Sequence, residues 1–180
     1  MTPRQLISQH HDFKIDLLSL DEPNNGRMIL KVKLTFNGQD VTQRILGQWS
    51  YIHNISDDQF NIDSLDKKSI YIPAEGNSII FHPDNFETHR ILTKSNSIQE
   101  YIGNIFGQKR LIELYSKTIV VTDLLTLKSK IITVDNDKRI EQAKMTTDNK
   151  IEISFRQVEV KGSVEKMKAR GTEIIADEID

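Results

Sequence analysis

The chain has 180 residues, of which 37% are hydrophobic and 28% charged, and its formal net charge is −2. This composition predicts a single packed, β-rich domain over residues 1–180 and excludes a chain that is disordered throughout. The small net charge excludes a strong general attraction to nucleic acid or membranes, and the absence of cysteine excludes disulfides, thiolate zinc sites and cysteine nucleophiles.

The location of the protein is predicted from its N-terminus and its apolar runs. The opening MTPRQLISQHHDF has no apolar core of signal-peptide length, and no apolar run approaches the roughly 20 residues that span a bilayer. With no cysteine, these features predict a soluble cytoplasmic protein. The abundance of Ile, Asn, Lys and Asp points to an A+T-rich bacterial or phage genome.

The N-terminus carries a helix-start pattern. Thr2 is suited to an N-cap, Pro3 to the first helical position, and Gln5 stands where a capping box places it. A short helix that ends near His10 is therefore predicted.

The clearest pattern follows in residues 28–36. Apolar residues occupy every even position, which predicts a half-buried strand with Leu30, Val32 and Leu34 facing the core. The pairs Asn25-Gly26 and Asn37-Gly38 favour hairpin turns. We expect an antiparallel meander from Phe13 to Leu46, in which residues 39–46 form the third strand.

The rest of the chain alternates between short apolar runs and turn residues. Ser97 and Glu100 form a second capping box before apolar residues at helical spacing, and Ser163 is suited to cap a few helical turns. A shift in alternation predicts a bulge near Arg156. Strands are predicted at 69–72, 78–82, 88–93, 110–115, 119–121, 127–134, 139–145, 151–160 and 172–176, and helices at 98–106 and 162–171.

These elements predict a mainly β fold, an antiparallel meander or sandwich of successive hairpins with two or three short helices. The hairpins 79–92 and 119–132 each carry an aspartate in the turn, Asp84 and Asp123, and these lie 39 residues apart. Because propeller blades repeat at about 40 residues, a small propeller-like repeat arrangement is the alternative.

Motifs for catalysis are sparse. The sequence has no G-x-S-x-G, no phosphate-binding glycine loop and no dinucleotide fingerprint. His82 and His89 flank a turn and are suited to acid–base chemistry. His10 and His11 precede Asp12, but no third ligand is marked, so neither a metal nor a cofactor is predicted.

The acidic segment 56–66, SDDQFNIDSLD, is the feature that the fold requires least. Clustered carboxylates can attract a basic protein, and apolar residues among them can supply a desolvated centre. The predicted partner-binding residues are Trp49, Tyr51, Asp57, Asp58, Phe60, Asp63 and Asp66.

The functional prediction is a protein-binding module without catalytic activity, namely a small bacterial inhibitor or immunity protein that neutralises a toxin. Its predicted partner is a protein with a basic toxin domain, and neither nucleic acid nor a membrane is expected to bind. The alternatives are a structural or assembly component of a phage or secretion apparatus, and a His-dependent hydrolase that uses His82 and His89.

Overall fold

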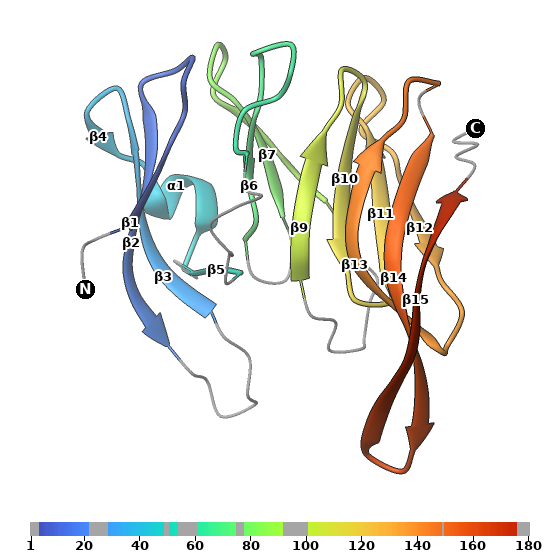
Figure 1. Cartoon of the computed structure of the whole chain (residues 1–180). Helices are drawn as coiled ribbons and strands as arrows, with labels where there is room; N and C mark the ends of the chain where they lie inside the picture. The colour runs from blue at the N-terminus through green and yellow to red at the C-terminus, as the bar shows by residue number, and fades with distance from the viewer. Residues whose placement is uncertain are drawn as a thin grey trace. The chain divides into compact units, whose positions relative to one another are not determined.

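The structure is a computed structural model that describes residues 4–21, 29–48, 51–53, 61–74, 78–91, 101–148 and 150–175. It is mainly β, with 64% of the described residues in strands that form antiparallel hairpins (Figure 1). This confirms the predicted fold class. The contacts within the chain define two compact units, whose described residues lie within Met1–Asn54 and Asn61–Thr93 for unit 1 and within Lys94–Asp180 for unit 2. The single domain remains a prediction.

The first sheet of unit 1, here the β1–β5 sheet, has the order β1-β2-β3-β4, and β5 also pairs with β3. Its strands are β1 (Arg4–Ile7), β2 (Phe13–Asp21), β3 (Ile29–Phe36), β4 (Gln39–Asp40) and β5 (Tyr51–His53). The predicted alternation in β3 is confirmed: Leu30, Val32 and Leu34 are buried, whereas Lys31 and Lys33 are exposed.

The turn after β3 is also confirmed. Asn37 and Gly38 both have positive φ, 48° and 75°, as a type I′ hairpin turn requires. The Asn25-Gly26 turn lies outside the described residues.

The prediction of a strand over residues 39–46 is wrong beyond Asp40, because Thr42–Leu46 forms the helix α1. The Thr42 hydroxyl oxygen accepts a hydrogen bond from the Leu34 amide at 2.8 Å, so a side chain takes the place of the next strand partner. The carboxylate of Asp40 accepts bonds from the Thr42 amide and hydroxyl. Gly47 ends the helix with a positive φ and donates to the carbonyl of Gln43.

The second sheet of unit 1, the β6–β8 sheet, is a meander of β6 (Ile70–Ile72), β7 (Ile79–His82) and β8 (Glu87–Arg90). Residues 62–64 run antiparallel to β6: the Tyr71 amide donates to the Ile62 carbonyl and the Ser64 amide donates to the Ser69 carbonyl. The strands predicted in this region are thereby confirmed over the described residues.

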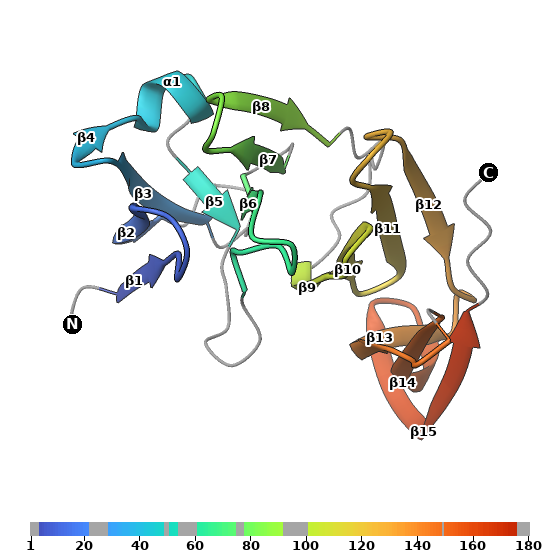
Figure 2. The same ribbon diagram turned by 90° about the horizontal axis from the view of Figure 1, so that it is seen from above.

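An aromatic cluster joins the two sheets of unit 1. Phe81 of β7 lies with its ring centroid 5.5 Å from Phe13 of β2, 5.4 Å from Phe36 of β3 and 5.1 Å from Phe86. The helix α1 lies beside β8 (Figure 2), where the Arg90 guanidinium donates to the Ile45 carbonyl. Large buried aromatic rings supply much of a core's apolar area, so this cluster holds the two sheets together.

Unit 2 begins with the β9–β12 sheet, in the order β12-β11-β10-β9. Its strands are β9 (Tyr101–Phe106), β10 (Arg110–Tyr115), β11 (Thr118–Asp123) and β12 (Ser129–Thr133). The start of β10 follows that of β6 by 40 residues, and the start of β11 follows that of β7 by 39. Both sheets are up-and-down meanders, but the propeller-like repeat remains a prediction.

The β13–β15 sheet completes unit 2, with β13 (Lys138–Met145), β14 (Ile151–Lys161) and β15 (Val164–Ile175). It packs on the β9–β12 sheet through a core that includes Ile112, Val121, Ile140 and Ile153. The register of β14 against β15 shifts between Gln157 and Val158, and the additional residue is Lys168 of β15. The bulge that was expected near Arg156 therefore lies on the neighbouring strand. Figure 1 shows β14 and β15 extending together beyond β13 as a long, twisted hairpin.

The three predicted helices are wrong. The described residues of the segments ending near His10, at 98–106 and at 162–171 include the strands β1, β9 and β15. In the described part of the chain, α1 is the only helix. Each of these strands pairs along its length with a neighbour: β1 with β2, β9 with β10, and β15 with β14 over eleven residue pairs. Capping patterns contribute about 1 kcal/mol, which complete strand pairing outweighs. Residues 97–100 lie outside the described residues.

Candidate functional site

Only three of the seven predicted partner-binding residues, Tyr51, Asp63 and Asp66, lie within the described residues. Trp49, Asp57, Asp58 and Phe60 lie outside the described residues. Tyr51 lies half-buried in β5. Their role in binding a partner remains a prediction.

The two described aspartates of the acidic segment bond within the chain. Asp63 is buried, and its carboxylate accepts hydrogen bonds from the Ser8 hydroxyl at 2.5 Å and from the Gln9 amide at 2.8 Å. Asp66 is exposed and accepts bonds from the Ser64 hydroxyl and the Lys68 amide. The buried carboxylate of Asp63 therefore joins the β1–β2 connection to the residues before β6.

The two candidate catalytic histidines, His82 and His89, do not oppose each other directly. The strand register sets His82 across from Glu87 and His89 across from Ile80. A ring nitrogen of His82, Nδ1, lies 3.1 Å from the buried Ser69 hydroxyl. His11 is used elsewhere, with its Nε2 atom 2.7 Å from the Lys67 carbonyl. The catalytic role of His82 and His89 remains a hypothesis.

Neither a metal site nor a membrane-crossing helix is present in the described residues. No group of three or more His, Asp or Glu side chains in these residues is placed to hold a metal ion. In the same part of the chain, no helix has the length and apolar character that crossing a membrane requires.

The most distinctive exposed feature of unit 2 is the edge strand β15. It has twelve residues, pairs with β14 on one side, and has no partner on its other side among the described residues. Residues 164–170 are all exposed, and the exposed fractions of Val164 and Met167 are 65% and 53%. Long edge strands with exposed apolar side chains are templates for pairing with another chain.

The edge of β15 is also basic. Residues 164–170, VEKMKAR, carry three cations and one carboxylate. That carboxylate, Glu165, is paired with the buried Arg139, and the hydrogen bond from Arg139 is the main cause that holds the pKa of Glu165 below its usual value. Lys168 lies 3.5 Å from a carboxylate oxygen of Glu159, and Arg170 lies 3.2 Å from one of Glu141. The cations of residues 164–170 outnumber the carboxylates of the same segment, and Lys166 is the one of them without an ion pair among the described residues.

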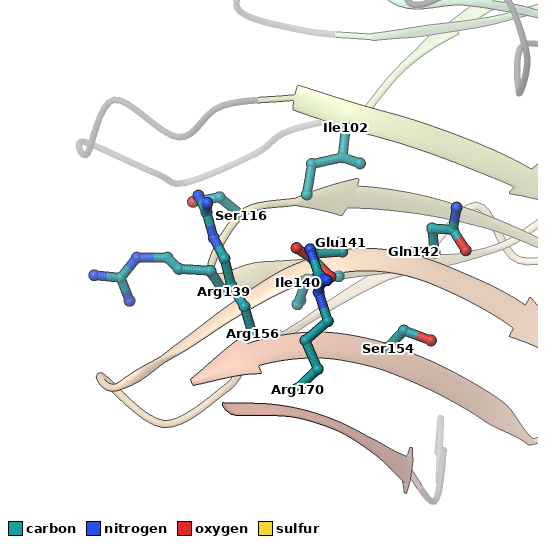
Figure 3. Close-up of a pocket in the computed structure, with 9 residues that line it drawn as sticks. All are labelled: Ile102, Ser116, Arg139, Ile140, Glu141, Gln142, Ser154, Arg156 and Arg170. Carbon is teal, nitrogen blue, oxygen red and sulfur yellow. The ribbon is translucent and has the colours of Figure 1, made fainter. Parts of the chain in front are cut away.

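A pocket of about 500 Å³ lies on the same unit. It is lined by Ile102, Ser116, Arg139, Ile140, Glu141, Gln142, Ser154, Arg156 and Arg170. In Figure 3 the guanidinium of Arg156 extends toward Ser116 and that of Arg170 lies beside Glu141, whereas the Arg139 guanidinium points away from both. The pocket is therefore rich in arginine, and Ile102 and Ile140 give it an apolar part.

The three arginines of the pocket occupy one row of the sheet. Arg139 pairs with Arg156 across β13 and β14, and Arg156 pairs with Arg170 across β14 and β15. We call these residues the arginine row. The row is not recognisable in the sequence, because its members are spaced 17 and 14 residues apart and only the strand register aligns them.

No family model matches the sequence, and no curated protein matches it. Among solved structures, the chain is similar to the extracellular domain of a hybrid two-component system from B. thetaiotaomicron, with a TM-score of 0.52 and 10% identity over 77% of this chain. A one-component version of that domain gives a TM-score of 0.48 at 10% identity over 76% of this chain. An oligogalacturonate lyase from Vibrio parahaemolyticus gives 0.42 at 13% identity over 82%.

The chain spans 19% of each of the two B. thetaiotaomicron chains and 38% of the lyase. At this level of identity, the first similarity concerns the fold alone. The other two TM-scores lie below 0.5 and support no further argument.

Proposed function

We propose that this chain is a protein-binding module without catalytic activity, and that it binds an extended, acidic segment of its partner as an added strand along β15. The observation on which this proposal rests is the free edge of β15, twelve residues long and exposed over residues 164–170. In strand addition, main-chain hydrogen bonds supply affinity and alternate side chains supply specificity.

The apolar side chains of the edge support a protein partner. Val164 and Met167 lie near the tip of the β14–β15 hairpin. Both side chains are exposed, and neither belongs to the core of unit 2. Exposed apolar side chains near an open hydrogen-bonding edge match a partner strand that carries apolar residues at alternate positions.

The charge of the edge supports an acidic partner segment. Lysine side chains on an edge strand oppose pairing with a second copy of the same edge, because like charges directly across a strand pair destabilise it. Where a partner strand carries glutamate or aspartate opposite Lys166 and Lys168, the repulsion becomes an attraction. The same lysines therefore select against self-pairing and in favour of an acidic strand.

The narrower role is that of an inhibitor or immunity protein that acts in the bacterial cytoplasm against a toxin. The acidic segment 56–66 is a second candidate surface for such a partner, in this case a basic one. Its test replaces Asp57, Asp58 and Asp66 with Asn and keeps Asp63, whose carboxylate is bonded within the chain. A toxin gene directly upstream, and rescue of cells that produce this toxin, would support the narrower role.

Strand addition is tested with a short peptide in which valine alternates with glutamate. Amide hydrogen exchange is measured by NMR with and without the peptide. We expect slower exchange at alternate amides of residues 164–175, because only every second amide of a strand points to one side. A peptide with lysine in place of glutamate should not slow exchange there.

The charge of the edge is tested with the double variant Lys166→Glu/Lys168→Glu. It should bind the acidic peptide at least about tenfold more weakly, and its affinity should depend less on salt. The matched control is Lys109→Glu/Lys128→Glu, which reverses two exposed lysines in the turns of the β9–β12 sheet. Unchanged exchange along β15 at saturating peptide, or equal losses in both variants, would contradict the proposal.

A further inference from the structure

The arginine row is an arrangement that requires negative charge. Directly opposed side chains of antiparallel strands lie on one face about 5 Å apart at Cβ, and like charges there destabilise the sheet. Arg139, Arg156 and Arg170 occupy three such positions in succession. The row is therefore stable only where carboxylates or another anion lie near it.

The chain supplies two of the required charges. The Arg139 guanidinium donates to Glu165, with its Nε 2.9 Å from the carboxylate oxygen, and its Nη1 donates to the carbonyls of Asn136 and Lys138 at 2.8 Å each. The Nε of Arg170 lies 3.2 Å from an oxygen of Glu141. The Nη2 of Arg139 also donates to Glu165, so four of the five donors of Arg139 are used within the chain.

A register irregularity positions Glu141. The register of β13 against β14 shifts between Ile140 and Gln142, which makes Glu141 the additional residue of a β-bulge. Bulges redirect a side chain and occur next to binding sites more often than elsewhere. Here the bulge brings the Glu141 carboxylate beside Arg170 and into the lining of the pocket.

Arg156 is the member of the row whose charge is not matched. Among the described residues its guanidinium makes no hydrogen bond and no ion pair, and it is exposed; its charge is the last of the causes that lower the pKa of Glu165. Three guanidinium groups against the carboxylates of Glu141 and Glu165 leave one positive charge. The pocket contributes further polar groups from Ser116, Gln142 and Ser154.

We infer that this pocket binds one oxyanion, a carboxylate or a phosphate group, between Arg156 and Arg170. The planar fork of an arginine matches two oxygens of such a group and holds them with two parallel hydrogen bonds. The pocket of about 500 Å³ is open to solvent and has room for more than a bare ion. An organic molecule or an acidic side chain that carries this group therefore fits it.

This inference does not rest on strand addition along β15. Arg156 belongs to β14, the central strand of its sheet, so its replacement leaves the edge of β15 unchanged. Loss of oxyanion binding with intact peptide protection along β15 would separate this site from the proposed function.

The test is a titration of the whole chain with inorganic phosphate and, separately, with acetate, followed by NMR at the arginine Nε–H groups. Ionic strength is held constant with chloride. We expect saturable shifts at Arg156 and Arg170 and little change at Arg139. The peptide with alternating glutamate then distinguishes the sources: if its side chains occupy the site, phosphate competes with it at Arg156.

Three variants complete the test. Arg156→Gln should weaken phosphate binding at least about tenfold, since a hydrogen bond to a charged group is worth about that factor, and Arg156→Lys should recover part of the affinity. Lys144→Gln is the matched control, because it removes an exposed cation of the same sheet outside the pocket. Shifts that rise linearly without saturation, or equal weakening in Lys144→Gln and Arg156→Gln, would overturn the inference.

Discussion

The hydroxyl of Ser8 donates a 2.5 Å hydrogen bond to the buried carboxylate of Asp63, 55 residues further along the chain. The same hydroxyl oxygen accepts bonds from the amides of His10 and His11, and the second carboxylate oxygen accepts from the amide of Gln9. This small network holds the β1–β2 connection against the residues that precede β6.

The network predicts that Asp63→Ala lowers the free energy of unfolding by about 3 kcal/mol, because hydrogen bonds to a charged group contribute roughly 1.5–3 kcal/mol each and their loss leaves the buried Ser8 hydroxyl without this acceptor. Urea denaturation measures the change. The control is Asp66→Ala at an exposed position, which should cost less than about 1 kcal/mol. Equal losses would show that Asp63 is not a special anchor.

The alternation in β3 predicts opposite outcomes for two neighbouring residues. Val32 is buried, and Val32→Asp should unfold unit 1, because an unpaired buried carboxylate costs several kcal/mol, on the order of a domain's whole stability. Lys33 is exposed and lies across from Asp16. Lys33→Asp sets like charges opposite each other and should cost about 1 kcal/mol or less. If thermal melting of the two variants is alike, the register is wrong.

Gly171 predicts a steric effect that a second substitution relieves. It lies across from Phe155, and a Cβ at this position would stand 2.8 Å from the Cζ atom of the Phe155 ring. Gly171→Ala should therefore destabilise unit 2 by about 1–2 kcal/mol. The double variant Gly171→Ala/Phe155→Leu should lose less than the sum of the single variants. A purely additive result would mean that ring and Cβ do not collide.

The turn between β11 and β12 predicts a dependence of stability on pH. The pKa of Asp123 is lowered, first by the hydrogen bond from the Thr126 amide and then by bonds from the Thr126 hydroxyl and the Leu125 amide. A carboxylate whose pKa is lower in the folded state stabilises the fold above its unfolded pKa of about 3.9, and this contribution is lost as the pH falls through the folded pKa.

Acid unfolding of the wild type should therefore be steeper below about pH 4 than that of Asp123→Asn, since the variant lacks this titrating group. Circular dichroism at a series of pH values measures both profiles, and NMR of the side-chain carboxyl follows Asp123 directly. Superimposable acid profiles would contradict the assignment.

Local patterns determined much of this fold. Alternation in residues 28–36 identified a strand and its buried face, and Asn37-Gly38 identified a turn, because both signals arise from residues close in sequence. The hairpin of β11 and β12 was predicted for the same reason. The absence of cysteine excluded whole classes of site.

Where the local preference for helix or strand is weak, the tertiary structure determines which of the two forms. Residues 4–7, 101–106 and 164–171 carry or follow helix-start patterns, but strand partners elsewhere in the chain decide their conformation, and pairing along a whole strand outweighs a cap. Conversely, Thr42 turns a predicted strand into α1 by bonding to Leu34.

The candidate sites also depend on the pairing of strands that are distant in the sequence. Arg139, Arg156 and Arg170 have no common spacing in the sequence, and a register shift of one residue would turn a strand's side chains to the other face. Aspartate is usually a surface residue, but Asp63 is buried and bonded to Ser8. A single sequence determines which segments alternate and turn, whereas the partner across the sheet, and with it the charge that each side chain meets, is determined only when distant strands pair.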